Sequence, residues 1–230
     1  MSTLPRRLVA EALGTSLLLA TVVGSGIMGV TLAQGNDAVA LLANAAATAA
    51  VLYVLIAVLG PISGAHFNPA VTLAMRMQRQ IGTRETLCYV CVQCIAAVLG
   101  VLLAHAMFEQ GLVQPGVRAR TGAAQWLSEA VATFGLVLTI LVGVRVRAAA
   151  IPALVAGWIL AAYWFTASTS FANPAVTMAL AITRSFAGIR PQDVPAFVAA
   201  QCVGAMLAVW VAAWLLADRP ARPEDEPPGS

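Results

Sequence analysis

The chain has 230 residues and a net charge of +3, and 60% of its residues are hydrophobic while only 10% are charged. Soluble domains carry about 25% charged residues, so this composition excludes an ordinary soluble globular protein. The basic residues are all arginines, and most lie at the ends of apolar stretches, as membrane topology would place them. We therefore expect the lipid bilayer as the surroundings of the chain and no nucleic acid as a partner.

Six apolar stretches are long enough to cross a membrane, since a helix needs roughly 20 apolar residues to span a hydrocarbon core of about 30 Å. They lie, in chain order, at residues 7–31, 38–60, 85–107, 126–145, 149–168 and 194–217. The first stretch resembles a secretory signal peptide, but it continues past Met28 without a clear cleavage site, so we interpret it as a retained span. We expect residues 1–217 to form a single transmembrane domain, and the Pro-rich, acidic segment 218–230 to be a disordered cytoplasmic tail.

Two further apolar segments, 68–78 and 173–184, are too short to cross the bilayer. At about 1.5 Å of rise per residue, each helix would reach about 16–18 Å, or half of the membrane. Both begin with the same tripeptide, Asn68-Pro69-Ala70 in one and Asn173-Pro174-Ala175 in the other.

Asn-Pro is a strong signal for the start of a helix. The Asn side chain caps a free backbone N–H, and Pro suits the first helical position. The preceding segments, 60–67 and 166–172, are predicted to be non-helical loops. Irregular backbone at membrane depth is tolerated only where it is buried in protein or lines a wet cavity, so these loops are expected to line a cavity.

The two halves of the chain repeat each other. Three pairs of segments match: Glu11-Ala-Leu-Gly-Thr15 with Glu129-Ala-Val-Ala-Thr133, Asn68-Pro-Ala-Val-Thr72 with Asn173-Pro-Ala-Val-Thr177, and Gln93-Cys-Ile-Ala with Gln201-Cys-Val-Gly. Each half, about 5–107 and about 125–217, contains three spans. Because three is odd, equivalent helices run in opposite directions, and the two short helices should meet at their N-termini. Each N-terminus carries about +0.5 charge, which opposes a passing cation.

The arginines predict the orientation in the membrane. With both termini in the cytoplasm, nine arginines lie inside (Arg6, Arg7, Arg76, Arg79, Arg84, Arg145, Arg147, Arg219 and Arg222). Four lie outside (Arg118, Arg120, Arg184 and Arg190). This excess favours cytoplasmic termini. The heavy use of Ala, together with Arg in place of Lys, suggests a bacterial source and hence the bacterial inner membrane.

Over roughly residues 5–217 the chain resembles the aquaporins, or major intrinsic proteins, and Gly64-Ala-His-Phe-Asn-Pro-Ala-Val-Thr72 is close to the family's first-loop signature. The resemblance implies an all-α fold with six transmembrane helices, two half-spanning re-entrant helices, and a passive pore in each subunit of a homotetramer. It implies that Asn68 and Asn173 donate hydrogen bonds into the pore, and that Glu11 and Glu129 support the pore loops. The pore-loop backbone would come from Gly64, Ala65, His66, Thr169 and Phe171. No enzymatic activity, cofactor or metal is expected.

The chain departs from the family at one position of the outer filter, where Val176 follows the second Asn-Pro-Ala in place of the usual Arg. The family's spacing implies a filter of Thr48, Ala161, Ser170 and Val176, with Tyr163 as the alternative to Ala161. Such a filter is wide and uncharged. It suits water, glycerol and similar neutral solutes, with arsenite or other metalloid species as further candidates, since the chain is similar to arsenic-associated bacterial aquaglyceroporins.

Two other functions are compatible with parts of this pattern. An ion- or proton-coupled secondary transporter can also use inverted repeats and broken helices. It needs a titratable group at the midplane, where this chain has Asn, although the intramembrane acids Glu11 and Glu129 could serve. A membrane enzyme needs a catalytic or metal constellation, which two isolated histidines do not supply. A nucleotide-driven pump is excluded because the chain has no phosphate-binding loop and no Lys.

Several Cys and His residues admit a functional and a structural interpretation. Cys88, Cys91 and Cys94 recur every three residues, so they could bind a thiophilic metalloid, but small apolar Cys also suits helix packing. His66 could sense protons or could simply fix its loop, and we favour the second.

Overall fold

Eight α-helices and three short 3-10 segments make up the described part of the chain, residues 2–217 of a computed structural model. They are α1 (Leu4–Ala33), α2 (Asp37–Ser63), α3 (Pro69–Met77), α4 (Thr83–Met107), α5 (Ala123–Val146), η1 (Ala148–Ala150), α6 (Ile151–Phe165), α7 (Pro174–Ala179), η2 (Leu180–Ile182), η3 (Pro191–Asp193) and α8 (Val194–Leu216). Residues 2–217 contain no strand. The predicted tail at 218–230 lies outside the described residues.

The structure confirms the prediction of six membrane-crossing helices. Six helical segments are long and apolar enough to span a bilayer: α1, α2, α4, α5, η1 with α6, and η3 with α8. The two short segments of the sequence are also helical, as α3 and as α7 continued by η2.

The boundary of the second span was predicted wrongly. We expected a loop from residue 60, but α2 continues to Ser63 with Pro61 inside its last turn. The helix ends only at Gly64, which has a left-handed backbone (φ 88°) and donates its N–H to the carbonyl of Gly60 at 2.9 Å. This is a glycine cap, and it tolerates a proline in the turn before it because only one backbone donor is lost.

Close helix packing within each half depends on a glycine at the matching position. A Cβ at Gly100 would lie 2.3 Å from the carbonyl oxygen of Ser16 on α1, and a Cβ at Gly204 would lie 2.2 Å from that of Ala130 on α5. Small residues at such crossings let two backbones approach. A glycine contact of the same kind therefore lets α4 pack closely on α1 and α8 on α5, as the inverted repeat requires.

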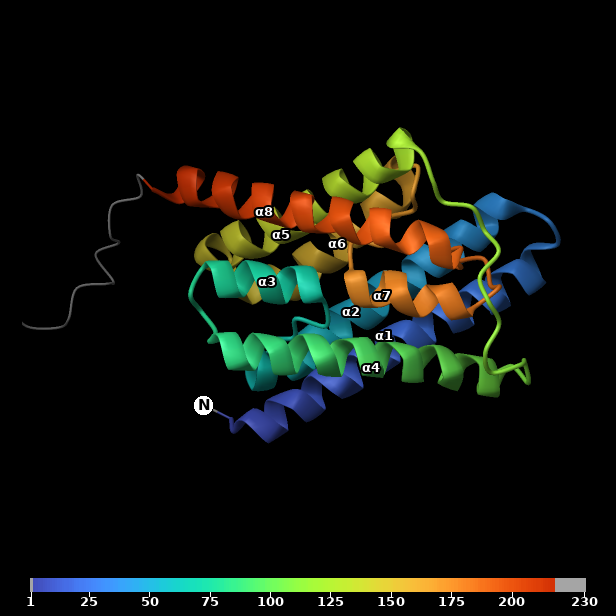
Figure 1. Ribbon diagram of the computed structural model, residues 1–230, viewed down its shortest axis with the longest axis horizontal. Helices are drawn as coiled ribbons and strands as arrows, with labels where there is room; N and C mark the ends of the chain where they lie inside the picture. The colour runs from blue at the N-terminus through green and yellow to red at the C-terminus, as the bar shows by residue number, and fades with distance from the viewer. Residues whose placement is uncertain (1, 218–230) are drawn as a thin grey trace, which may run out of the picture.

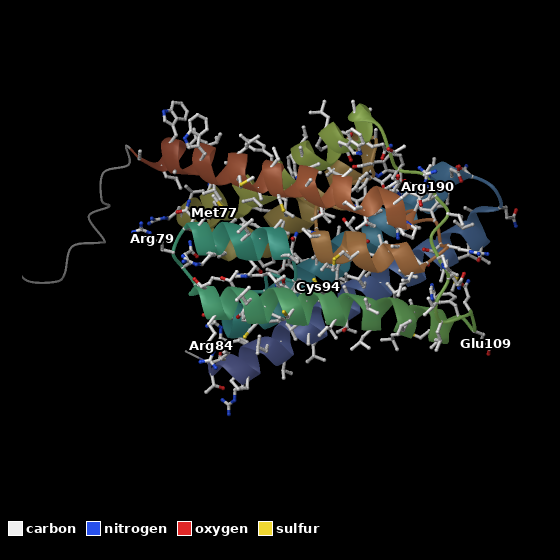
Figure 2. The ribbon with its side chains drawn as sticks, viewed as in Figure 1. Met77, Arg79, Arg84, Cys94, Glu109 and Arg190 are labelled. Atoms are coloured by element: carbon white, nitrogen blue, oxygen red, sulfur yellow. The ribbon has the colours of Figure 1, made fainter. Side chains whose placement is uncertain are left out.

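Figure 1 shows α3 and α7 nearly end to end in the middle of the bundle, so the start of one helix faces the start of the other. The N-terminal end of α1 and the C-terminal end of α8 lie at the same end of the molecule (Figure 1). Figure 2 places Arg79 and Arg84 at that end, and Glu109 and Arg190 at the opposite end. An even number of spans, with the short helices re-entering from opposite sides, accounts for this arrangement.

Candidate functional site

Each half-helix begins at an Asn that caps it. The Asn68 Oδ1 accepts the N–H of Ala70 at 2.8 Å, and the Asn173 Oδ1 accepts the N–H of Ala175 at 3.0 Å. Both Asn residues have an extended backbone and are followed by Pro in the first helical turn. The local chemistry that predicted two helix starts is therefore present at both.

The same two side chains also connect the halves of the protein. The Asn68 Nδ2 donates to the carbonyl of Ala172 at 2.7 Å, and the Asn173 Nδ2 donates to the carbonyl of Phe67 at 2.8 Å. A primary amide has two N–H donors. One donor of each Asn is therefore used across the pseudo-symmetry axis, and within residues 2–217 the other has no protein acceptor assigned to it. Both Asn residues line a cavity, so this second donor is available to a solute.

The loops before the half-helices hold a strained backbone. Ala65 and Phe67 in the first loop, and Ser170 and Ala172 in the second, have positive φ angles between 47° and 52°. For residues other than glycine, a left-handed conformation costs about 1–2 kcal/mol. Such a conformation persists only where the surroundings determine it, so both loops need strong anchors.

Glu11 and Glu129 are those anchors. The Glu11 carboxylate accepts the N–H groups of His66 at 3.0 Å and Phe67 at 2.7 Å. The Glu129 carboxylate accepts those of Phe171 and Ala172, both at 2.9 Å. The two side chains are fully buried, although each comes from a long spanning helix. Each acid thus fixes the two peptides before an Asn, with their carbonyls directed away from it.

The matching glutamines complete this support, and sequence reasoning missed their role. The Gln93 Nε2 donates to Glu11 at 2.8 Å and to the hydroxyl of Thr72 at 3.0 Å. The Gln201 Nε2 donates to Glu129 at 2.6 Å and to the hydroxyl of Thr177 at 2.7 Å. The Gln-Cys match between the halves was the available signal. Gln93 on α4 and Gln201 on α8 therefore each connect a spanning helix to the buried Glu and to the half-helix of the same half.

The cavity that runs beside the two half-helices has a volume of about 100 Å³ and two kinds of lining. Its polar lining includes Asn44, Thr48, His66, Asn68, Tyr163, Thr169, Ser170 and Asn173. Its apolar lining includes Leu18, Val22, Leu52, Ile56, Val71, Met75, Leu136, Ile140, Ile151, Val155, Ile159, Val176 and Leu180. Gly64, Ala65 and Phe171 also border it. Hydrogen-bonding groups are therefore few and fixed, and most of the wall is hydrocarbon.

Three of the four residues inferred for the filter lie together at this cavity: Thr48, Ser170 and Val176. Ala161 does not, because it is exposed on the outer surface of α6. Residues two positions apart on a helix point in directions that differ by about 200°, so Tyr163 faces inward where Ala161 faces outward. The Tyr163 hydroxyl lies 3.3 Å from the Thr48 Oγ1, which makes the alternative position the one at the cavity.

Of the Cys and His residues considered in the sequence, only His66 borders the cavity. Cys88, Cys91 and Cys94 are on α4 and are absent from the cavity lining; Figure 2 shows Cys94 about halfway along that helix. His66 lines the cavity, and its Nδ1 lies 3.1 Å from the hydroxyl of Thr72. His105 is buried near the far end of α4, with its Nε2 2.9 Å from the hydroxyl of Thr183. In residues 2–217, no three His, Cys, Asp or Glu side chains form a group that could hold a metal ion.

Comparison with known proteins decides the family. Residues 1–171 match the model of the major intrinsic proteins. The chain belongs to the major intrinsic protein family. A major intrinsic protein is a membrane channel, so this chain is a multi-pass channel and not an enzyme, and its fold is the aquaporin fold.

Among relatives of this major intrinsic protein, the aquaglyceroporin AqpS of Rhizobium meliloti is 54% identical over 220 residues, covering 96% of this chain and 93% of that protein. The probable aquaporin AqpM of Archaeoglobus fulgidus is 33% identical over 243 residues, covering 91% and 96%. The X-ray structure of the aquaglyceroporin from Plasmodium falciparum superimposes with a TM-score of 0.73, covering 94% of this chain and 98% of that one. Its 16% identity supports the fold alone.

Proposed function

We propose that this channel passes small neutral hydroxylated solutes of about the size of glycerol, together with water, down their concentration gradients. The observation that carries the proposal is the pair of free amide donors, from Asn68 and Asn173, in a cavity whose wall is mostly hydrocarbon. A polyol can direct its hydroxyl groups at the donors and loop carbonyls while its carbon backbone faces the apolar wall. The name of the relative from Rhizobium meliloti, an aquaglyceroporin, supports this solute class.

The same site opposes cations and protons. The N-termini of α3 and α7 direct partial positive charge at the midplane, and the Asn donors require an acceptor oxygen there. A water molecule that accepts from both Asn residues is turned so that it cannot relay a proton from its neighbour. Selectivity of this kind follows from fixed donors and dipoles and needs no gate.

Thr48, Tyr163, Ser170 and Val176 are the residues that we propose as the outer constriction. Three of them carry a hydroxyl and none is charged. An Arg at residue 176 would add a long side chain and five donors to the same ring. With Val there, the opening suits solutes wider than water, and neutral metalloid hydroxides such as arsenite are included in the proposal on size and polarity.

We also propose how the chain is oriented in the membrane and how its subunits assemble. The count of arginines in the sequence supports cytoplasmic termini in the bacterial inner membrane. Arg79 and Arg84 lie at the end of the molecule where α1 begins (Figure 2). Large apolar side chains are exposed on the outer faces of the spanning helices, as lipid contact and subunit contact both require. We propose a homotetramer with one pore in each subunit, and residues 1–217 as one channel domain.

Swelling of proteoliposomes under gradients of water, glycerol, urea and arsenite tests the proposal. Glycerol flux should follow the solute gradient alone and should be unchanged when the proton gradient is collapsed. Val176→Trp should block flux because it fills the cavity, whereas Met178→Trp should not, because Met178 is 41% exposed on the same half-helix. Flux that requires a proton gradient would indicate a secondary transporter instead.

A further inference from the structure

The sequence placed Arg120 among the four arginines outside the membrane, but it gave no reason to expect this side chain to be buried. Arg120 belongs to the connection 108–122 between α4 and α5, yet it is only 3% exposed. Its Nε donates to the carbonyl of Gly188 at 2.9 Å, and its Nη1 donates to the carbonyl of Ser168 at 2.7 Å. No local signal distinguishes it from the other outer arginines, because its burial results from contacts with residues 48 and 68 positions away.

The guanidinium of Arg120 lies directly behind the wall of the cavity. It contacts the hydroxyl of Thr169 at 3.3 Å and lies 4.5 Å from the ring centroid of Phe171. Both of these residues line the cavity, and Arg120 itself does not. The positive charge is therefore separated from the solute path by one layer of side chains.

The position of Arg120 is fixed by its own backbone. Its N–H donates to the Asp193 Oδ2 at 2.8 Å, and the N–H of Arg190 donates to the carbonyl of Arg118 at 2.9 Å. A Cβ at Gly116 would lie 2.0 Å from the carbonyl oxygen of Ile189, so the connection also packs tightly against the segment before α8. The charge is thus held in one place and needs no rearrangement to act on a solute.

The charge of Arg120 is not cancelled by an ion pair. The hydrogen-bond acceptors of its guanidinium are two backbone carbonyls and one hydroxyl oxygen, and the two ion pairs in residues 2–217 are Arg7 with Glu85 and Arg190 with Asp193. Burial, and after it the neighbouring charge of Arg118, lowers the pKa of Arg120 to about 10, while the buried acid Glu129 and Tyr163 act in the opposite direction. The group therefore remains protonated at neutral pH.

We propose that Arg120 gives the outer constriction a barrier to cations of its own, additional to the dipoles of α3 and α7 at the midplane, and that it acts from behind the pore wall while Val176 leaves the lumen open. This rests on the proposed function, because it assigns the charge selectivity of that same pore. In surroundings of low dielectric constant, a fixed charge acts across a few ångströms with little screening. The arrangement separates two properties that a lumenal Arg would combine: the width of the opening and its rejection of cations.

Arg120→Gln tests the proposal, with Arg184→Gln as the control. Arg184 is an exposed arginine of the same outer group, and its Nε donates to the carbonyl of Pro115 at 3.4 Å, so its charge is screened by water. We expect the sodium and proton leak of Arg120→Gln proteoliposomes to rise by at least about tenfold, as loss of a nearby unit charge predicts. Glycerol swelling should stay within about twofold of wild type, and Arg184→Gln should change neither quantity.

A charge rescue separates this electrostatic role from a scaffolding role. Arg120→Lys keeps the charge and loses the forked hydrogen bonds, so it should retain most of the cation rejection. The double variant Arg120→Gln with Val176→Arg places a guanidinium in the lumen, so it should restore cation rejection and reduce glycerol flux. Arg120→Met is the second neutral variant, should the Gln variant fail to insert.

Two results would overturn the inference. One is a cation leak that stays at the wild-type level in a neutral Arg120 variant that inserts and passes glycerol. The other is a leak that appears equally in Arg120→Lys and is not reversed by Val176→Arg, which would make Arg120 a scaffold only. Failure of the proposed function is distinct from both, because wild-type vesicles would then show no more glycerol swelling than empty ones.

Discussion

Replacing Glu129 with Gln tests how the second pore loop is held. Three N–H donors converge on the two oxygens of Glu129: Phe171 on Oε1 at 2.9 Å, and Ala172 and Gln201 on Oε2 at 2.9 Å and 2.6 Å. A carboxylate satisfies all three because it is acceptor-only. Gln has one acceptor oxygen, and its NH₂ group would take the place of the other. In either orientation of the amide, this NH₂ group would face at least one of the three N–H donors.

The expected loss can be bounded from these contacts. In its better orientation the substituted amide would leave at least one buried backbone donor without an acceptor, which costs about 1–3 kcal/mol. For a chain of this size, 1 kcal/mol corresponds to about 2–4 °C in melting temperature, so we expect a decrease of about 2–12 °C. The left-handed residues Ser170 and Ala172 lose their anchor at the same time, so glycerol flux per inserted channel should fall several-fold.

Thermal unfolding of the detergent-solubilised protein and proteoliposome swelling measure the two effects. Glu109→Gln is the control, because Glu109 is an exposed acid at one end of the molecule (Figure 2) and the same atoms change there. If Glu129→Gln melted and conducted like wild type, then the second carboxylate oxygen would not be required. The loop would in that case be held by the rest of its packing.

Three further substitutions address other parts of the molecule. Gly204→Ala should destabilise the fold by about 1–3 kcal/mol, because its Cβ would lie 2.2 Å from the carbonyl oxygen of Ala130; thermal unfolding should show no loss for Gly157→Ala, where nothing lies within 4 Å. Val176→Arg should lower the ratio of glycerol to water permeability in paired swelling assays, and an unchanged ratio would place Val176 outside the constriction. Asn173→Asp should reduce flux, since an acid at the midplane costs on the order of 3 kcal/mol and cannot donate to the loop carbonyl; full flux through correctly inserted channels of this variant would contradict the role of the amide.

The features that sequence predicted are those determined locally or by repetition. Asn68 and Asn173 were identifiable because capping depends on the next few residues, and six apolar runs are visible in composition alone. Ala161 was misplaced because counting back from a motif fixes a distance along a helix more reliably than its angular phase. Arg120 could not be recognised at all, since a loop arginine becomes buried only through tertiary contacts that leave no pattern in the sequence.

The exchange of hydrogen bonds between the two Asn residues has a consequence for how the channel is made. The acceptor of Asn68 is the carbonyl of Ala172, which is separated from it by 104 residues. The first half of the protein must therefore be synthesised and inserted while its half-helix still lacks this partner. The centre of the pore can form only after the second half has entered the membrane, so its assembly is a late step in biogenesis that requires both halves at once.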